Sequence, residues 1–261
     1  MKVVKFGGSS LASGNSVDKA LSIINADPER QVVVVSAPGK RTEDDIKVTD
    51  LMITYAYMSL RSNNYQDIAT RIFKRYELIA QYFELPEAEL EDIKQLLLTL
   101  PKLSYPNNDY RMATFKAHGE RLNAILIAKI LNHQGIKARF LEPKDVGLIV
   151  TGTSNNAEVN PETYVNLKRI KAAKDEKIIF PGFYGITPSG HIATFSRGGS
   201  DITGAILARG LNADLYENFT DVDAIFSANP HIVDQPKPIK RMTYQEMREL
   251  SYAGFSVFHD E

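Results

Sequence analysis

Two short glycine-containing segments carry the residue types best suited to chemistry. Residues 5–10 read Lys-Phe-Gly-Gly-Ser-Ser, and residues 196–201 read Ser-Arg-Gly-Gly-Ser-Asp. Each segment follows a short apolar run that predicts a strand and precedes a stretch with helical periodicity. Backbone N–H groups that converge where a strand turns into a helix favour an anion, because they lack partners and the helix dipole attracts negative charge.

Charged side chains in these segments add to the backbone donors. Arg197 offers a planar guanidinium that can hold a carboxylate or phosphate with two hydrogen bonds. Asp201 places a carboxylate beside it, and Lys5 places an ammonium group at the end of the first strand. Phosphoryl transfer depends on positioning, positive charge and N–H donors. We therefore interpret the two segments as halves of a phosphoryl-transfer site in which Asp201 holds Lys5 in place.

Both segments also have simpler interpretations. A Gly-Gly pair is most often only a tight turn. Ser200 followed by Asp201 is an ordinary helix start, with serine as the N-cap. The sequence contains no Walker A pattern, no Gly-x-Gly-x-x-Gly fingerprint and no protein-kinase signature. These patterns alone therefore indicate an α/β phosphate-handling enzyme, and a kinase of a small molecule in particular.

The composition argues against several other classes of protein. The 261 residues carry a formal charge of −1, which gives no basic field for nucleic acid or an anionic membrane. The absence of cysteine excludes thiol catalysis and fits a cytoplasmic protein. No apolar run approaches the roughly 20 residues of a membrane helix, and we expect no signal peptide. The five histidines lack metal-ligand spacing, so we predict no dedicated metal site.

The surrounding pattern predicts the elements that position these segments. Residues 2–6 and 31–36 predict strands, and residues 16–26 between them predict a helix, which together form a βαβ unit with a parallel sheet. The acidic cluster at residues 43–45 is interpreted as a solvated loop tip, with a metal site as the minority alternative. From residues 49–50 to about residue 100 the pattern is almost wholly helical, with breaks at residues 63–64 and 85–86.

The second half of the chain continues the α/β pattern. A helix is predicted over residues 111–134, and Gly119 inside it costs about 1 kcal/mol relative to alanine, which close approach of a ligand or another helix would explain. Residues 152–156 are predicted to form a polar loop. Further strands are predicted at residues 137–141, 148–151, 177–180, 191–195 and 214–218, and further helices over residues 161–173, 202–210 and 243–250.

Several motifs occur in a fixed order along the chain. They are Lys-Phe-Gly-Gly-Ser-Ser (5–10), Val-Val-Ser-Ala (34–37), Thr-Asp-Leu (49–51), Gly-Glu (119–120), Gly-Phe (182–183), Arg-Gly-Gly-Ser-Asp (197–201) and Thr-Asp-Val (220–222). This order resembles that of the aspartokinases over residues 2–259. The resemblance implies the amino-acid-kinase fold, a three-layer αβα sandwich around a mostly parallel open sheet, with residues 43–110 as a helical insertion. It also implies an amino-acid-binding lobe to about residue 190 and a nucleotide-binding lobe over residues 191–261.

The resemblance further implies an activity and a set of site residues. The reaction would be ATP-dependent phosphorylation of the side-chain carboxylate of L-aspartate to 4-phospho-L-aspartate, the first step towards lysine, threonine and methionine, with Mg²⁺ accompanying ATP. Lys5 would stabilise the transferring phosphoryl group, and Asp201 would organise the active-site cations. The implied substrate-binding residues are Thr49, Glu120, Phe183, Arg197 and Ser200. The implied nucleotide-binding residues are Lys5, Gly7, Gly8, Ser9, Thr220, Asp221, Phe226 and His231.

The implied pocket suits a zwitterion. Arg197 would grip the α-carboxylate of aspartate, and Glu120 its ammonium group. A pocket for acetylglutamate would have no ammonium to satisfy, so a buried glutamate there would be a cost. Two alternatives stay open: another small-molecule kinase of the same fold, acting on glutamate, acetylglutamate or UMP, and a regulatory protein that binds a nucleotide or amino acid without turnover.

The chain departs from the family pattern on the nucleotide side and in length. Many relatives have tyrosine at Phe226, arginine at His231 and lysine near Ser256, and Lys240 or Arg241 could substitute for the missing cations. Aspartokinases usually continue into a paired regulatory region of ACT type. We therefore expect a shortened form that lacks feedback inhibition, and in which any homodimer is weakened.

Overall fold

The computed structural model describes most of the chain and divides it into two compact units. The described residues are 1–61, 65–173, 175–196, 198–220, 226–227, 233 and 235–252. The first unit, Met1–Phe219, contains the central sheet, and the second, Thr220–Glu261, contains helix α8 (Tyr244–Tyr252). A capping box starts α8, because Thr243 Oγ1 accepts from the Glu246 N–H while the Glu246 carboxylate accepts from the Thr243 N–H. The predicted final helix is therefore confirmed.

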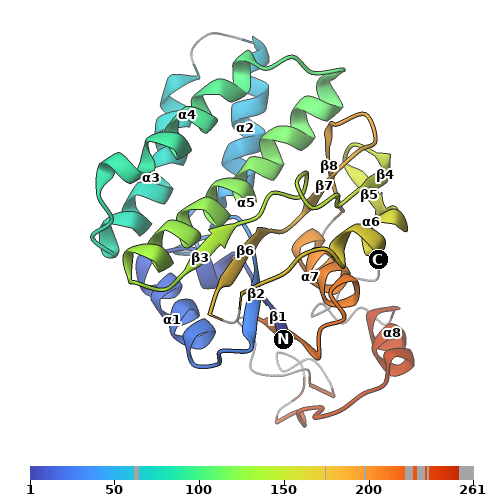
Figure 1. The fold of residues 1–261 in the computed structure, drawn as a ribbon. Helices are drawn as coiled ribbons and strands as arrows, with labels where there is room; N and C mark the ends of the chain where they lie inside the picture. Colours follow the sequence, from blue (N-terminus) through green and yellow to red (C-terminus); the bar gives the residue numbers. More distant parts are fainter. Residues whose placement is uncertain are drawn as a thin grey trace. The chain divides into compact units, whose positions relative to one another are not determined.

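A five-stranded parallel sheet forms the centre of the first unit (Figure 1). From edge to edge its strands are β3 (Ala138–Phe140), β6 (Lys177–Pro181), β2 (Arg30–Val35), β1 (Lys2–Phe6) and β9 (Leu215–Phe219). Helix α1 (Gly14–Asn25) connects β1 to β2 and is capped by the side chain of Ser13. This arrangement confirms the predicted βαβ unit and its parallel strands.

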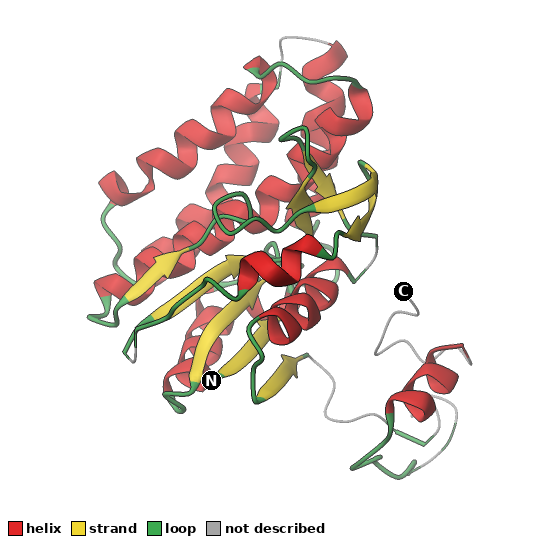
Figure 2. Cartoon of the chain, turned by 45° about the vertical axis from the view of Figure 1, so that its right-hand side comes forward, coloured by secondary structure: helices red, strands yellow, loops and turns green. Residues whose placement is uncertain are grey.

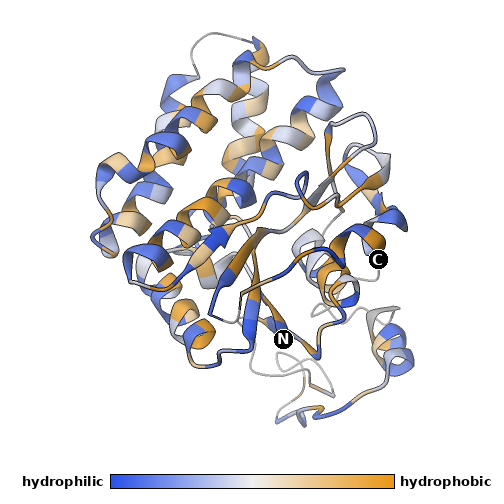
Figure 3. Cartoon of the chain, in the orientation of Figure 1, coloured by the Kyte–Doolittle hydropathy of each residue, from blue (hydrophilic) through white to orange (hydrophobic). Residues whose placement is uncertain are grey.

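The β-branched strands bury side chains on both faces of the sheet. Val33 and Val35 belong to a core shared with α1 and with α5 (Asn108–His133). Val32 and Val34 belong to a second core shared with α6 (Glu162–Leu167) and α7 (Gly199–Gly210). Figure 2 shows the helices on both sides of the strands, and in Figure 3 strand β6 and much of α5 are hydrophobic. The predicted three-layer α/β fold is confirmed.

Helices occupy most of residues 43–110, as the periodicity predicts. They are α2 (Val48–Arg61), α3 (Gln66–Tyr82), α4 (Glu91–Thr99) and the start of α5, with short 3-10 turns at Glu87–Leu90 and Leu100–Lys102. The predicted break at residues 85–86 falls between α3 and the first of these turns. The other predicted break, at residues 63–64, lies outside the described residues. Within the described residues, none of these or any other helix is long and apolar enough to cross a membrane.

A buried arginine ties this helical segment to the loop after β2. Arg75, on α3, is 5% exposed, donates to the carbonyl of Gly39 and lies 3.2 Å from Asp45. Hydrogen bonds from Arg41 hold the pKa of Asp45 well below its usual range. Within the acidic cluster at residues 43–45, only Glu43 and Asp44 are exposed as the predicted solvated tip. For Asp45 that prediction is wrong, because two guanidinium groups pair with its carboxylate.

Two other segments differ from their predictions. Residues 152–156 are not simply a polar loop, because they contribute to an antiparallel hairpin of β4 (Val150–Thr153) and β5 (Asn156–Val159). These strands expose polar side chains, so they lack the apolar alternation that signals a strand. Helix α6 ends at Leu167 and not at residue 173, because the following chain leaves the helix and packs apolar side chains against the second core.

The strand predicted at residues 191–195 has an unexpected partner. It forms β8 (Ile192–Thr194), which pairs antiparallel with β7 (Tyr184–Ile186) in a separate two-stranded sheet. The turn between them includes Gly190 at φ 85°, a left-handed conformation that glycine adopts without strain. The segment before α7 is therefore delivered by a hairpin and not by a strand of the central sheet.

The buried position of α5 leads to a stability prediction. Leu126 of α5 is fully buried, so Leu126→Ala should lower the free energy of unfolding by about 2–5 kcal/mol through lost burial and a residual cavity. Leu60 of α2 is 47% exposed, and the matched change Leu60→Ala should cost less than about 1 kcal/mol. Urea unfolding of both variants measures the difference, and equal losses would contradict the assigned core.

Candidate active site

A buried ion pair joins the two segments singled out in the sequence. The Nζ atom of Lys5, at the end of β1, lies 2.8 Å from Oδ1 of Asp201, in the first turn of α7. Lys5 is 7% exposed, whereas the Asp201 side chain keeps 33% of its surface exposed. The structure therefore brings the two predicted catalytic residues together, with one charge enclosed and the other reaching solvent.

Asn218 completes this cluster and was missed in the sequence. Its Nδ2 atom donates to the same Oδ1 of Asp201 at 2.8 Å. Asn218 lies directly opposite Lys5 because β9 pairs with β1 in parallel register, so both side chains reach the same carboxylate. The strand pattern predicted β9 itself, but only the pairing of β9 with β1 marks this residue as part of the site.

The first glycine segment packs tightly against the loop that follows β2. Gly8 accepts a hydrogen bond from the Gly39 N–H at 2.8 Å, and a Cβ atom at Gly8 would lie 2.9 Å from the carbonyl oxygen of Ala37. Gly7 has more space, since a Cβ there would lie 3.7 Å from the Lys5 ammonium. Ser9 is exposed. Backbone and ammonium group thus stand together at the carboxyl end of β1, where α/β proteins bind ligands.

The second glycine segment starts α7 without a side-chain cap. Gly198 is the N-cap residue at φ 77°, so Ser200 lies inside the first turn and is not the N-cap that the simpler interpretation expected. Ser200 is buried against Gly182, where a Cβ atom would lie 2.5 Å from the serine Oγ. The glycine after β6 is therefore what allows α7 to approach the sheet edge so closely. Arg197 lies outside the described residues.

Phe183 holds a strained backbone conformation at this edge. Its φ of 80° is left-handed, which is rare for a residue with a bulky side chain. Its N–H donates to Thr203 Oγ1 at 3.0 Å, and its carbonyl accepts from the Phe195 N–H at 2.8 Å. The ring packs against Gly199, where a Cβ atom would lie 2.5 Å from the ring. Strain fixed by surrounding contacts is typical of residues that present a side chain to a ligand.

Glu120 is a buried carboxylate with an unused acceptor. It lies on α5, is 5% exposed, and its Oε2 atom has no hydrogen-bond partner among the described residues. Burial raises the pKa of Glu120 to about 8, and a hydrogen bond from the Ala37 backbone opposes the shift. Gly119 allows this approach, because a Cβ there would lie 2.9 Å from the Ala37 side chain. This helical glycine therefore allows close contact with the loop after β2, and Val48 at the start of α2 lies next to it as well.

A polar network fixes the turn of α5 around Glu120. Thr114 accepts a hydrogen bond at 2.8 Å from Nδ1–H of His118, whose Nε2 accepts from Arg121 at 3.0 Å. Arg121 pairs with Glu142 at 2.7 Å, and the Tyr184 hydroxyl donates to the same carboxylate. Burial lowers the pKa of His118 to about 3, so the ring is neutral. The network links α5 to the hairpin that precedes α7.

Lys116 is a second residue that the sequence analysis missed. It lies one helical turn before Glu120, and its Nζ atom is 5.5 Å from the centroid of the Phe183 ring. The i, i+4 spacing on a predicted helix was the available signal, because it places both side chains on one face. Thr49 lies in the first turn of α2, and its neighbour Val48 is next to Gly119.

The predicted nucleotide-side residues after β9 belong to the second unit. Thr220 is exposed, and Phe226 forms an isolated antiparallel bridge with Pro238 inside that unit. Asp221 and His231 lie outside the described residues. Across the part of the chain that the structure describes, no group of three histidine, aspartate or glutamate side chains could hold a metal ion.

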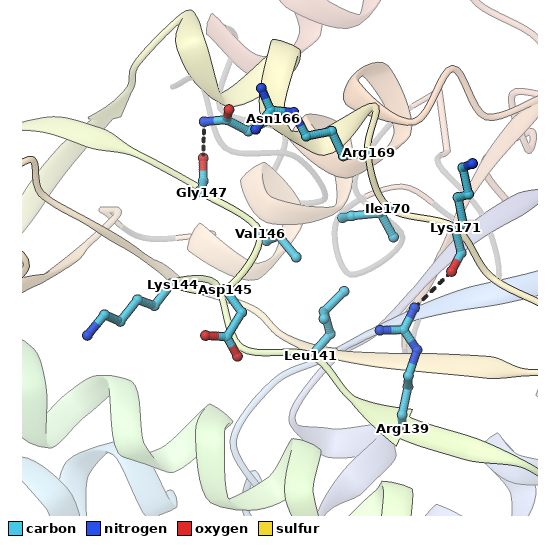
Figure 4. Close-up of a pocket in the computed structure, with 10 residues that line it drawn as sticks. All are labelled: Arg139, Leu141, Lys144, Asp145, Val146, Gly147, Asn166, Arg169, Ile170 and Lys171. Atoms are coloured by element: carbon cyan, nitrogen blue, oxygen red, sulfur yellow. Dashed lines mark hydrogen bonds between the residues drawn. The ribbon is translucent and has the colours of Figure 1, made fainter.

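A separate cavity of about 560 Å³ lies between β3 and α6, away from these residues (Figure 4). Its polar wall includes Arg139, which donates to the carbonyl of Lys171, and Asn166, which donates to that of Gly147. The side chains of Arg169 and Lys171 also line it. Figure 4 shows apolar side chains between these polar groups.

The fold agrees with the comparisons to known proteins. Residues 1–261, the whole chain, match the amino acid kinase family. The chain belongs to this family.

Among individual relatives, aspartokinase 3 of Bacillus subtilis is 53% identical over 261 residues, which are 100% of this chain and 57% of that protein. The crystal structure of Clostridium acetobutylicum aspartate kinase superimposes with a TM-score of 0.82 at 35% identity, over 100% of this chain and 56% of that one. The crystal structure of Escherichia coli aspartokinase III in complex with aspartate and ADP gives a TM-score of 0.85 at 24% identity. This match covers 100% of this chain and 58% of that one. The predicted resemblance to aspartokinases is confirmed, and the chain spans a little over half the length of these relatives.

The buried carboxylate gives a pH-dependent prediction. Because the pKa of Glu120 is raised to about 8 in the folded chain and is near 4.5 when unfolded, its stabilising effect is present below pH 4.5 and lost as pH rises through 8. Between pH 4.5 and pH 8, the free energy of unfolding of the unliganded chain should therefore fall relative to that of Glu120→Gln. The fall should be about 1.4 kcal/mol for each unit of difference between the folded and unfolded pKa. Urea titrations at pH 5, 6.5 and 8 test this, and parallel pH profiles for both proteins would refute it.

Proposed function

We propose that this chain phosphorylates the side-chain carboxylate of L-aspartate with ATP, giving 4-phospho-L-aspartate and ADP. The observation that carries the proposal is the meeting, at one sheet edge, of the Lys5–Asp201 ion pair with strained Phe183 and the unpartnered Oε2 atom of Glu120. The 53% identity to an aspartokinase over the whole chain supports it.

The proposed reaction follows from the charges at this edge. A side-chain carboxylate oxygen of aspartate attacks the γ-phosphorus of ATP, the bond to the β-phosphate oxygen breaks, and ADP leaves with the electron pair. Lys5 neutralises charge on the transferring oxygens, and Asp201 with Asn218 holds its ammonium group in position. The aspartate ammonium would ionise Glu120 and satisfy its free oxygen.

The nucleotide side of the proposal rests on the first glycine segment. Gly7, Gly8 and Ser9 would receive the ATP phosphates, and the resemblance adds Thr220, Asp221, Phe226 and His231 as nucleotide-binding residues. Because the described residues hold no cluster of metal-binding side chains, Mg²⁺ would be bound through the phosphates and its own waters, with the exposed part of Asp201 nearby. Bound in this way, Mg²⁺ would screen the phosphate charge. The assignment of residues 1–190 to the amino acid and 191–261 to the nucleotide stays a prediction.

The decisive experiment is an ADP-release assay with L-aspartate in which hydroxylamine traps the acyl phosphate. We expect hydroxamate and ADP in equal amounts with aspartate. Glutamate, acetylglutamate and UMP serve as alternative acceptors in the same assay. ADP release with one of these and not with aspartate would identify a sister kinase, and binding of aspartate without any ADP release would favour a regulatory protein.

Removal of either member of the ion pair should abolish turnover. Lys5→Ala and Asp201→Ala should each lower kcat by several orders of magnitude, because each removes preorganised charge at the transferring group. Lys19→Ala, at an exposed position on α1, is the matched control and should leave kcat unchanged. Circular dichroism checks that the variants fold. A near-normal kcat in a folded Lys5→Ala or Asp201→Ala protein would exclude the assigned role.

Arg197 should contribute mainly to substrate binding. Loss of a charge-assisted hydrogen bond to the α-carboxylate should raise the KM for aspartate in Arg197→Ala by about 10-fold or more, with a smaller change in kcat. Arg71→Ala, at an exposed position on α3, is the control. Steady-state kinetics with varied aspartate measure both constants, and a loss confined to kcat would contradict this assignment.

A further inference from the structure

We propose that Lys116 binds a carboxylate of the amino-acid substrate and, with Glu120, recognises it as a zwitterion. The inference deepens the proposed function and rests on it. It assigns Lys116 a direct substrate contact at a position outside the recognised motifs.

The position of Lys116 is set by two elements. Residues 116 and 120 are one turn apart on α5, so their side chains emerge from the same face of the helix. The Lys116 ammonium lies over the face of the Phe183 ring, 5.5 Å from its centroid. That ring is itself held by the left-handed backbone of Phe183 and by its contact with Gly199. The Lys116 ammonium therefore lies near the N-terminus of α7, at the carboxyl end of the sheet.

The surroundings of Lys116 leave its charge uncompensated. The side chain is half-buried, and within the described residues it forms no ion pair and no hydrogen bond. Two other enclosed lysines behave differently: Lys5 pairs with Asp201, and Lys177 donates to three backbone carbonyls. Burial lowers the pKa of Lys116, while the carboxylate of Glu120 opposes the shift. A partly desolvated ammonium group whose only described contact of this kind is an aromatic ring can still bind an anionic ligand.

Glu120 supplies the opposite half of the same site. Its buried Oε2 lacks a donor among the described residues, and Lys116 lies more than a salt-bridge distance away, because no ion pair joins them. One turn of α5 thus carries an unused acceptor and an unpaired cation on the same face of the helix. A ligand with an ammonium group and a carboxylate satisfies both groups.

The test separates substrate binding from a structural role. We compare the full chain with Lys116→Met, which removes the charge but keeps the length, and with Lys116→Arg, which keeps the charge. Lys19→Met, at an exposed position on α1, is the control. The measurements are the KM for aspartate, the KM for ATP, kcat, and the Kd for aspartate alone by calorimetry.

We expect Lys116→Met to raise the KM and Kd for aspartate by about 10- to 100-fold, because a charge-assisted contact is lost. The KM for ATP should change by less than about twofold, and Lys116→Arg should recover most of the aspartate affinity. An unchanged Kd for aspartate in folded Lys116→Met overturns the inference, as does equal loss of affinity for aspartate and ATP. If Lys116→Met does not fold, the same comparison is made with Lys116→Gln.

Failure of the proposed function is distinguishable from failure of this inference. Wild-type protein that releases no ADP with aspartate refutes the kinase assignment, yet the calorimetric comparison of wild type with Lys116→Met still tests the carboxylate contact. Normal wild-type turnover combined with an unchanged aspartate KM in Lys116→Met refutes the contact alone.

Discussion

The ion pair between Lys5 and Asp201 connects the start of the first unit to its last helix. A partly buried pair gains attraction but also costs desolvation, so its net contribution to stability is small. The main effect of the ion pair is on position, because it holds the N-terminus of α7 against the end of β1. Asn218 adds a donor from the neighbouring strand and holds the same oxygen. The three groups meet only because β1 pairs with β9 on one side and β2 on the other.

The site also depends on glycines that let neighbouring segments of backbone come close together. Gly8 and Gly119 both approach Ala37, and Gly182 approaches Ser200, at distances where a Cβ atom would collide. These contacts draw the ends of β1, β2 and β6 together with α5 and α7. Backbone groups can then stand near a ligand without intervening side chains, which is how glycine-rich loops present N–H donors.

The charges of Glu120 and Lys116 suit the proposed zwitterionic ligand. Glu120 is enclosed with its pKa raised to about 8, and Lys116 is half-buried over Phe183 without an ion pair among the described residues. Each group alone would favour its neutral form. The proposed zwitterionic substrate would reverse both preferences by bringing the opposite charge to each group. The His118–Arg121–Glu142 network keeps this turn of α5 in place without using Glu120 or Lys116.

The sequence by itself determined the α/β class, the helical segment and both glycine loops, because periodicity and turn residues are local signals. It also singled out Lys5 and Asp201 through the two glycine segments, and Glu120 through the resemblance carried by motif order. Tertiary structure alone decided that β8 belongs to a hairpin, that Asn218 lies opposite Lys5, and that Lys116 lies over Phe183. These features depend on strand pairing and helix packing between residues distant in sequence. No local pattern specifies which side chains such pairing brings within hydrogen-bond distance.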